Sequence, residues 1–359
     1  MRWELTEEQQ MFQEALRGWL EREAPSAAIR RWNDSGDPSP YERALTNESW
    51  LGVGVSEELA GQGGGLIELV LAAEEFARAG APSSGWLATV LAAPALASRP
   101  DVGAAALGKG ELAALVVTAG APPDVPSSRV TFADGRLDGS VVTVLGADRA
   151  RQLVVPVWTD GRPRLVLVES VAQGVAVSGR RLLDRSRTVA EVSFDAAVAT
   201  VLEIDAGPVL ASAALRAAVL VAADSLGAMD RMLDLAVDYS KQRHQFGAPI
   251  GSFQAVKHAA ATILVAVEAA RSIVYLAAAA VEELHPAAVL YAATAKAQVT
   301  ASGMAAADSS LTMHGAIGYT WEYDLQLFYK RAMLDGYLFG KPELWNERLA
   351  SALPLLPSN

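Results

Sequence analysis

A polar stretch, Arg243 to Gln254 (RHQFGAPIGSFQ), interrupts a long apolar helical pattern in this chain. The planar guanidinium of Arg243 can bind phosphate oxygens through several N–H donors at once. Phe246 offers an apolar surface, and Gln254 can donate or accept hydrogen bonds. The same residues also fit a plain helix end, with Arg243 solvated and residues 247–249 forming a turn. From the stretch alone, both interpretations stay open.

Two acidic residues could serve as a general base in the C-terminal half. Asp224 follows the apolar run Val219–Ala223, so it needs a partner or a raised pKa, and packing against a charged neighbour is the simpler expectation. Asp335 is expected to be a solvated residue on a helix face. Glu322 is expected to be a helix-start acid that the helix dipole favours.

The histidines predict no metal site. There are four of them, at positions 244, 258, 285 and 314, and they form no spaced cluster with carboxylates. The chain has no cysteine, which excludes disulfides, thiolate metal sites and a cysteine nucleophile. This composition fits a reducing compartment, and we expect a cytoplasmic protein.

Charge and hydropathy exclude further classes of function. The net charge is −11, and no cluster of Lys and Arg is present, which argues against nucleic-acid binding. Residues 1–8 carry acids where an export signal needs a basic start and an apolar run. The alanine-rich tracts carry charged or polar residues before they reach membrane-spanning length, so we expect no membrane contact. The high apolar content instead suggests oligomer contacts.

The elements that must position these residues change type twice along the 359-residue chain. The first region is helical: Thr6 to Gln9 resembles a capping box, and apolar residues at helical spacing follow. They are Met11, Phe12, Ala15, Leu16, Trp19 and Leu20. A second helix is expected over 66–79. The glycine cluster 61–65 before it lacks the Lys-Ser/Thr ending of a phosphate loop, so we expect a turn with unusual backbone angles.

The second region is rich in short β runs separated by Asp-Gly pairs, which are typical of antiparallel strands joined by tight turns. The runs cover 129–132, 137–144, 152–157, 164–168 and 189–194, and the pairs begin at Asp134, Asp138 and Asp160. The third region returns to long apolar helices over 206–243, 253–284, 286–313 and 323–338. We therefore expect an α+β chain with an N-terminal helical domain (1–107), a middle antiparallel β domain (108–204) and a C-terminal four-helix bundle (205–359).

This order of regions coincides with local motifs, and together they resemble the acyl-CoA dehydrogenase family over essentially the whole chain. The motifs occur in the family's order and are Trp50–Glu58 with Ala73–Gly80, Leu137–Gly139 with Ala147–Val155, RHQFG at 243–247 with Phe253-Gln254, and Met313–Thr320. The resemblance implies an oxidoreductase that removes hydrogens from the α and β carbons of an acyl-CoA thioester, with FAD as cofactor and electron-transfer flavoprotein as electron acceptor.

The resemblance also assigns a cofactor role to the opening stretch. In the family this segment approaches the pyrophosphate and adenosine half of FAD, commonly the FAD of a neighbouring subunit. It implies FAD contacts for Arg243, Gln245, Phe246 and Gln254. A second family element, a Gln followed after two residues by Gly-Gly, matches Thr312, Gly315 and Ala316 only in part, because the glutamine and the second glycine are replaced. Gly315 fits a helix C-terminal glycine equally well.

The chain departs from the family where the chemistry is done. The family's catalytic glutamate lies either ten residues before the glycine of a Leu-Gly pair or in a C-terminal Glu-Gly-Thr triplet. Here the pair is Leu226-Gly227, and the two positions hold Ala217 and Phe339, neither of which can accept a proton. The segments that meet the flavin ring are also altered: residues 117–128 keep Thr118 and prolines only, and 142–145 (VTVL) replace a Trp-Ile-Thr strand.

These departures imply a degenerate, non-catalytic subunit that completes the FAD site of a paralogous subunit in an α2β2 heterotetramer. Some family members that act on bulky substrates, including steroid side chains, resemble this arrangement. Two alternatives stay open. One is a self-sufficient homo-oligomer with an unusual base, either Asp335 or Asp224, and the other is a flavin-free scaffold of the same fold.

Overall fold

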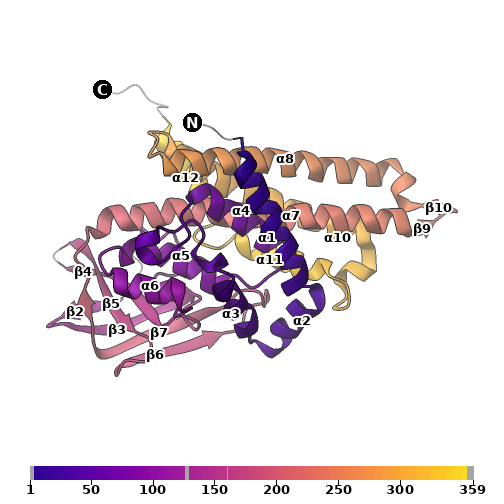
Figure 1. Cartoon of the computed structure of the whole chain (residues 1–359). Coiled ribbons are helices and arrows are strands. Elements are labelled where there is room, and N and C mark those ends of the chain that lie inside the picture. Colours follow the sequence, from indigo (N-terminus) through magenta and orange to yellow (C-terminus); the bar gives the residue numbers. More distant parts are fainter. Residues whose placement is uncertain (1–3, 126–128, 160, 354–359) are drawn as a thin grey trace. The chain divides into compact units, whose positions relative to one another are not determined.

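The computed structural model describes residues 4–125, 129–159 and 161–353, and its elements follow the expected order of helices, strands and helices (Figure 1). The first helices are α1 (Glu7–Glu23), α2 (Ser26–Ser35), α3 (Ser39–Asn47), η1 (Trp50–Gly52), η2 (Glu57–Leu59), α4 (Leu66–Ala79), α5 (Ser84–Leu96) and α6 (Pro100–Gly108). The chain divides into two compact units, one comprising 1–29, 70–81 and 218–359, the other 30–69 and 82–217. The boundaries 107/108 and 204/205 remain predictions.

The second of these units contains two four-stranded sheets, ordered β1-β4-β5-β8 and β2-β3-β7-β6. Their apolar faces share one core with Ala88 of α5, and Leu137, Val155 and Val192 are buried there. The strands are β1 (Ala113–Leu115), β2 (Thr131–Ala133), β3 (Arg136–Leu145), β4 (Gln152–Thr159), β5 (Arg162–Glu169), β6 (Val175–Arg180), β7 (Val189–Val198) and β8 (Thr200–Val201). The expectation of purely antiparallel strands was wrong in one place, because β1 pairs with β4 in parallel.

The Asp-Gly pairs play different roles. Asp134 and Gly135 have φ angles of 50° and 75° and form the expected tight turn between β2 and β3. Asp138-Gly139 is not a turn: it lies inside β3 at a register shift, where the Asp138 carboxylate accepts a hydrogen bond from the Ala196 N–H. Asp160 lies outside the described residues. Strands β1, β6 and β8 were not predicted, because each is short or partly exposed.

The N-terminal helix starts as predicted. Thr6 Oγ1 accepts a hydrogen bond from the Gln9 N–H, and the Gln9 side chain accepts one from the Thr6 N–H, which completes the capping box. Of the predicted face, Leu16, Trp19 and Leu20 are buried, but Met11 is 62% exposed. The glycine turn is confirmed as well, because Gly63 and Gly64 have positive φ angles.

The C-terminal helices lie within three residues of the predicted ranges, except that the last helix was not predicted. They are α7 (Ala206–Gln242), α8 (Gln254–Glu282), α9 (Ala288–Thr294), the π-helical η4 (Ala295–Val299), α10 (Thr300–His314), the 3₁₀ turn η5 (Gly315–Tyr319), α11 (Leu325–Asp335) and α12 (Pro342–Ala352). The single helix expected over 286–313 is therefore interrupted by a π segment. Glu322 lies ahead of α11 rather than in its first turn, which corrects its expected role.

In the helical unit, α4 and α7 approach each other at Gly227. A Cβ atom added there would lie 2.0 Å from the carbonyl oxygen of Glu74, so no other residue fits without moving a backbone. The Leu226-Gly227 pair thus has a packing reason. Near this contact, the Asp224 carboxylate binds the Arg331 guanidinium through two hydrogen bonds of 2.7 Å, and both side chains are buried. The expected charged neighbour of Asp224 is confirmed.

Two helices, α7 and α8, contain 18-residue windows long and apolar enough to cross a membrane. Every 18-residue window of either helix nevertheless contains at least one charged residue, as expected. The α7 window is 67% buried and the α8 window 50% buried within the protein. A buried core helix passes the same composition test, so these windows are weak evidence for a membrane.

We expect Asp224→Asn to lower the free energy of unfolding by about 3–5 kcal/mol, because it leaves the buried Arg331 charge uncompensated. Urea unfolding of the purified chain measures this. The exposed pair Arg99–Asp101 supplies the control, and Asp101→Asn should leave the stability nearly unchanged, because solvent screens an exposed ion pair. Equal effects of the two substitutions would contradict the role assigned to the buried pair.

Candidate functional site

The stretch that follows α7 folds into a β-hairpin. Strand β9 (His244–Gln245) pairs with β10 (Ala248–Pro249) in antiparallel register, and Phe246-Gly247 form the two-residue loop. Their φ angles, 54° and 79°, are both positive, as a type I′ turn requires. The Ile250 N–H donates to the Arg243 carbonyl at 2.8 Å, which closes the base of the hairpin before α8 begins.

Phe246 lies at the tip of this hairpin, with its ring in solvent and its backbone in an unfavourable conformation. Its side chain is 94% exposed, and it contacts Phe253 edge-to-face at 6.1 Å between ring centroids. A bulky residue with positive φ costs about 1–3 kcal/mol, since Asn or Gly suits that position better. An exposed aromatic ring held in a costly conformation is typical of a contact with another molecule.

The polar side chains of the hairpin are exposed as well. Arg243 and Gln245 are exposed, and so is Gln254, the first residue of α8. Among the described residues, no hydrogen bond or ion pair engages the Arg243 guanidinium. Five N–H donors on one fixed plane are therefore available for an anion.

The second predicted cofactor contact, formed by Thr312, Gly315 and Ala316, lies at the end of α10. Gly315 ends this helix with φ of 62°, and a Cβ atom added there would meet nothing within 4 Å, so its backbone is open to an approaching ligand. Ala316 is exposed beside it. Thr312 is exposed too, but its hydroxyl donates to the Asp308 carbonyl at 2.9 Å, which leaves only its lone pairs for a ligand. Gly315 thus has the helix-end role, and its cofactor role remains a prediction.

An aromatic stack joins the two elements. Tyr239, four residues before Arg243, stacks on His314 at 4.8 Å, and His314 directly precedes Gly315. The His314 ring also bonds the Tyr323 hydroxyl at 3.1 Å and the Ser310 carbonyl at 2.7 Å. No sequence pattern predicts this support, because Tyr239 lies on α7, His314 ends α10 and Tyr323 lies in the turn before α11.

Similarity to known proteins identifies the family of this chain. The N-terminal domain model of the acyl-CoA dehydrogenases matches residues 6–99, and the C-terminal domain model matches residues 208–353. Acyl-CoA dehydrogenase IpdE2 of Mycobacterium tuberculosis is 32% identical over 350 residues, which cover 96% of this chain and 97% of IpdE2. The chain belongs to the acyl-CoA dehydrogenase family. Members of this family are flavoprotein oxidoreductases that act on acyl-CoA.

Other acyl-CoA dehydrogenases differ in length and assembly. FadE34 of M. tuberculosis is 31% identical over 358 residues, yet these cover only 48% of FadE34. Among solved structures, the Tcur3481-Tcur3483 steroid ACAD G363A variant shares 25% identity and a TM-score of 0.86, over 96% of this chain and 97% of that one. The ChsE4-ChsE5 complex from M. tuberculosis has a TM-score of 0.87 over the full length of both chains. At 23% identity, this similarity shows a shared fold alone.

Ala217 and Phe339 stand at the two positions to which the family resemblance assigns the catalytic base. Ala217 is fully buried, and Phe339 is 2% exposed, with φ of 53°. Its loop is anchored, since the Phe339 carbonyl accepts from Trp345 Nε1 at 2.9 Å, and the Gly340 carbonyl accepts from the buried Lys296 Nζ at 3.0 Å. Burial lowers the pKa of Lys296 to about 8.

Neither alternative base is exposed. Asp335 is fully buried, which corrects its expected place on a solvated helix face. Asp224 has both carboxylate oxygens bound to Arg331, so it is poorly placed to take a proton from a substrate. Among the described residues, no group of three or more His, Asp or Glu is placed to hold a metal ion.

The two segments that the resemblance assigns to the flavin ring lie side by side. The Thr118 and Thr143 hydroxyls are 2.9 Å apart, and the Ala119 N–H donates to the Thr143 carbonyl at 2.8 Å. Thr143 has φ of 56° at a register shift in β3, and Val142 beside it is exposed. Pro126, Ser127 and Ser128 lie outside the described residues. The two segments are therefore hydrogen-bonded to each other in this chain.

A buried acidic cluster next to Gly227 also escaped sequence analysis. Glu74 accepts a hydrogen bond from the Tyr275 hydroxyl at 2.8 Å and lies 3.5 Å from the Arg271 guanidinium. Burial raises the pKa of Glu74 to about 7, and the nearby carboxylates of Glu75 and Asp230 add to this, while Arg271 and Tyr275 oppose it. The double glutamate gave no sign of burial, because its position on α4 depends on packing with α7 and α8.

We expect Phe246→Asn to raise the free energy of unfolding of the isolated chain by about 1 kcal/mol, because Asn-Gly suits a type I′ turn. Chemical denaturation measures this, with the exposed substitution Lys257→Ala as control. A loss of stability would show that the Phe246 ring supports the isolated fold rather than a contact with another molecule.

The raised pKa of Glu74 predicts a pH-dependent stability. A carboxyl group whose pKa is higher folded than unfolded stabilises the fold fully below about pH 4.5, and this contribution is lost as the pH rises through about 7. Between pH 5 and 8 the wild type should lose about 2–3 kcal/mol more than Glu74→Gln. Urea unfolding across this range measures it, with exposed Glu14→Gln as control. Parallel pH profiles for the wild type and Glu74→Gln would contradict this assignment.

Proposed function

We propose that this chain is the FAD-site-completing subunit of a heteromeric acyl-CoA dehydrogenase. A paralogous subunit supplies the flavin-ring pocket, the thioester pocket and the catalytic glutamate. This chain lends the adenosine and pyrophosphate side through Arg243, Gln245, Phe246 and Gln254, with Thr312, Gly315 and Ala316 as a second contact. The observation that carries the proposal is the exposed guanidinium of Arg243, which no described residue pairs, at the base of a strained hairpin. The chain also holds Ala217 and Phe339 at the base positions that the resemblance assigns.

The donors of the hairpin fit the anionic half of FAD. A planar guanidinium can bind two phosphate oxygens at once, and a charge-assisted bond of this kind is stronger than a neutral one. The exposed Phe246 ring suits an apolar or aromatic contact, and the glutamine amides can both donate and accept. When bound, FAD supplies the hydride acceptor for the β carbon of the acyl group. The residues of this chain bind and orient that cofactor.

The missing base explains why a second type of subunit is needed. Removal of the α proton requires a positioned group that can accept it, and neither Ala217 nor Phe339 can. A homo-oligomer of this chain would therefore combine two cofactor contacts with no base. A paralogue that keeps the glutamate removes this difficulty.

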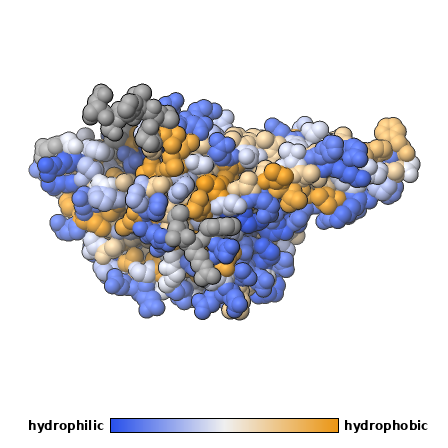
Figure 2. All heavy atoms as spheres, turned by 90° about the horizontal axis from the view of Figure 1, so that it is seen from above, coloured by the Kyte–Doolittle hydropathy of each residue, from blue (hydrophilic) through white to orange (hydrophobic). Residues whose placement is uncertain are grey.

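The relatives and the surface support a heteromer. The names of two similar structures, Tcur3481-Tcur3483 and ChsE4-ChsE5, each join two proteins, and FadE34 is about twice as long as the part this chain matches. The exposed apolar residues Leu264 and Val265 lie on α8, and Figure 2, which looks onto this helix, shows hydrophobic residues among hydrophilic ones. Such a face suits a subunit contact.

The substrate belongs to the same proposal. We propose an acyl-CoA thioester, with electron-transfer flavoprotein as the electron acceptor and a cytoplasmic site of action. The name of Tcur3481-Tcur3483 points to a steroid substrate for that protein, and a bulky acyl group is the candidate to test first here. The two alternatives gain no support: Asp224 is committed to Arg331, and a flavin-free scaffold leaves the unpaired Arg243 unexplained.

Co-purification with a paralogous acyl-CoA dehydrogenase that keeps the catalytic glutamate tests the proposal. Arg243→Ala in this chain should lower the flavin retained by the complex at least tenfold, because a charge-assisted phosphate contact is worth about 1.5–3 kcal/mol. Flavin released on denaturation is measured by absorbance. The exposed substitution Lys241→Ala, two residues earlier, removes a cation without this effect. A lone chain that is yellow and oxidises acyl-CoA normally would contradict the proposal.

A further inference from the structure

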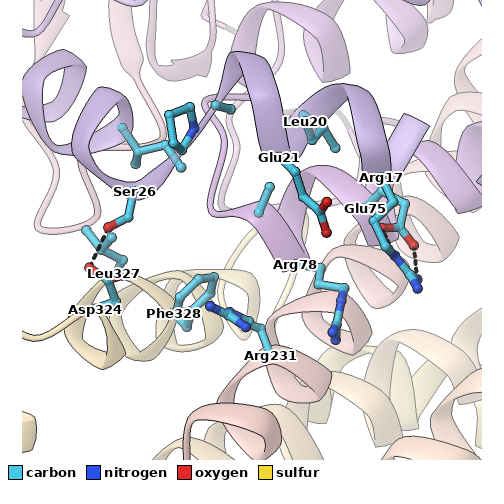
Figure 3. A pocket seen from close by; sticks show the side chains of 14 residues that line it. Arg17, Leu20, Glu21, Ser26, Glu75, Arg78, Arg231, Asp324, Leu327 and Phe328 are labelled. Atoms are coloured by element: carbon cyan, nitrogen blue, oxygen red, sulfur yellow. Dashed lines mark hydrogen bonds and ion pairs between the residues drawn. The ribbon is translucent and has the colours of Figure 1, made fainter. Parts of the chain in front are cut away.

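A cavity of about 250 Å³ lies in the helical unit, away from the hairpin (Figure 3). Its walls come from α1, the start of α2, α4, α7 and α11. One part is apolar and includes Leu20, Ile29 and Phe328, while the charged part includes arginines from three different helices. A mixed lining of this kind is typical of small-molecule sites, in which apolar surface supplies area and a few polar groups fix orientation.

The three arginines differ in their ion-pair and hydrogen-bond partners. Arg17 binds Glu75 through two hydrogen bonds of 2.9 and 2.6 Å. Arg78 is paired with Asp230 and with Asp234. The third guanidinium, that of Arg231, has no hydrogen bond or ion pair with any residue that the structure describes. Arg231 is half-buried, so part of its hydration is lost without a carboxylate to replace it.

The acidic side chains that line the cavity do not pair with the Arg231 guanidinium. Glu21 is exposed at the rim, and the Asp324 carboxylate accepts a hydrogen bond from the Ser26 hydroxyl at 2.6 Å. Figure 3 shows these acids and Arg231 around one space, with Phe328 beside it. Their negative charges disfavour a multiply charged anion such as phosphate, whereas a single carboxylate needs only one guanidinium.

We propose that this cavity binds a small amphipathic monocarboxylate. Its carboxylate pairs with Arg231 in a bidentate contact, and its apolar body packs against Leu20, Ile29 and Phe328. Since one water occupies about 30 Å³ of liquid, the cavity has room for a body of roughly six to eight non-hydrogen atoms. Medium-chain and aryl carboxylic acids belong to this class.

This site is separate from the proposed cofactor contact. Arg231 precedes Arg243 by twelve residues, which is about 18 Å along a helix at 1.5 Å per residue. No residue of the hairpin lines the cavity. The inference therefore does not depend on flavin binding or on the identity of a partner subunit, and it can be tested on the whole chain by itself.

Calorimetric titration of the chain with hexanoate, hexanol and inorganic phosphate tests the proposal. Hexanoate should bind saturably at one site per chain. Hexanol lacks the carboxylate and phosphate lacks the apolar body, so both should bind at least tenfold more weakly. Arg231→Gln should weaken hexanoate at least tenfold. Arg231→Lys, which keeps the charge but loses the fork, should weaken it less. Lys241→Ala, a cation removed from the same helix, should leave binding unchanged.

A second variant guards against misfolding of the first. Ala79 lines the cavity at the end of α4, so Ala79→Leu should fill the space and block hexanoate while Arg231 stays in place. Circular dichroism confirms that each variant is folded. The proposal is overturned if hexanoate does not saturate the wild type, if phosphate binds as well as hexanoate, or if folded Arg231→Gln and Ala79→Leu both bind like the wild type.

Discussion

The close approach of α4 and α7 at Gly227 is the constraint on which the helical unit depends. The missing side chain lets the two backbones touch, and a Cβ atom there would come within 2.0 Å of the Glu74 carbonyl oxygen. This contact sets the depth at which the charged residues of both helices are buried. Glu74 must then find Tyr275 and Arg271, and Asp224 must find Arg331. Buried charges of this kind persist only when each has a partner.

The same constraint extends to the candidate site. Because α7 is fixed against α4, its far end carries Tyr239 to a defined place, where it stacks on His314 and supports the end of α10. The hairpin with Arg243 and Phe246 starts four residues after Tyr239. A rigid interior thus presents a strained, exposed tip. This combination is physically reasonable for a surface that completes a site in another molecule, since the cost of the strain is covered by the packing behind it.

Much of this organisation could be predicted from the sequence. The capping box at Thr6, the change of period from helices to strands and the glycine turn are local patterns, and local patterns are what a sequence displays directly. The RHQFG stretch combined residue types that suit a phosphate contact, and the family resemblance added its neighbours. The absence of a base at Ala217 and Phe339 could be stated only through that resemblance, since an alanine and a phenylalanine suggest no chemistry by themselves.

What the sequence did not reveal depends on packing between distant segments. The exposure of Met11, the burial of Asp335 and the parallel pairing of β1 with β4 each follow from what lies opposite, which spacing does not encode. The partners of Arg331 and Lys296 likewise depend on packing between distant segments, and so does the lack of a partner for Arg231 among the described residues. A solvated aspartate was the ordinary expectation for Asp335, and it was wrong because α11 is buried along that face.

The central claim is that this chain lends cofactor contacts to a partner and holds no complete flavin site of its own. The most direct measurement is the ratio of FAD to polypeptide in the purified complex, from flavin absorbance and quantitative amino-acid analysis. The account predicts about one FAD for every two chains, because only the partner's ring pocket is filled. A ratio of one FAD per chain, or a complex without flavin, would contradict it.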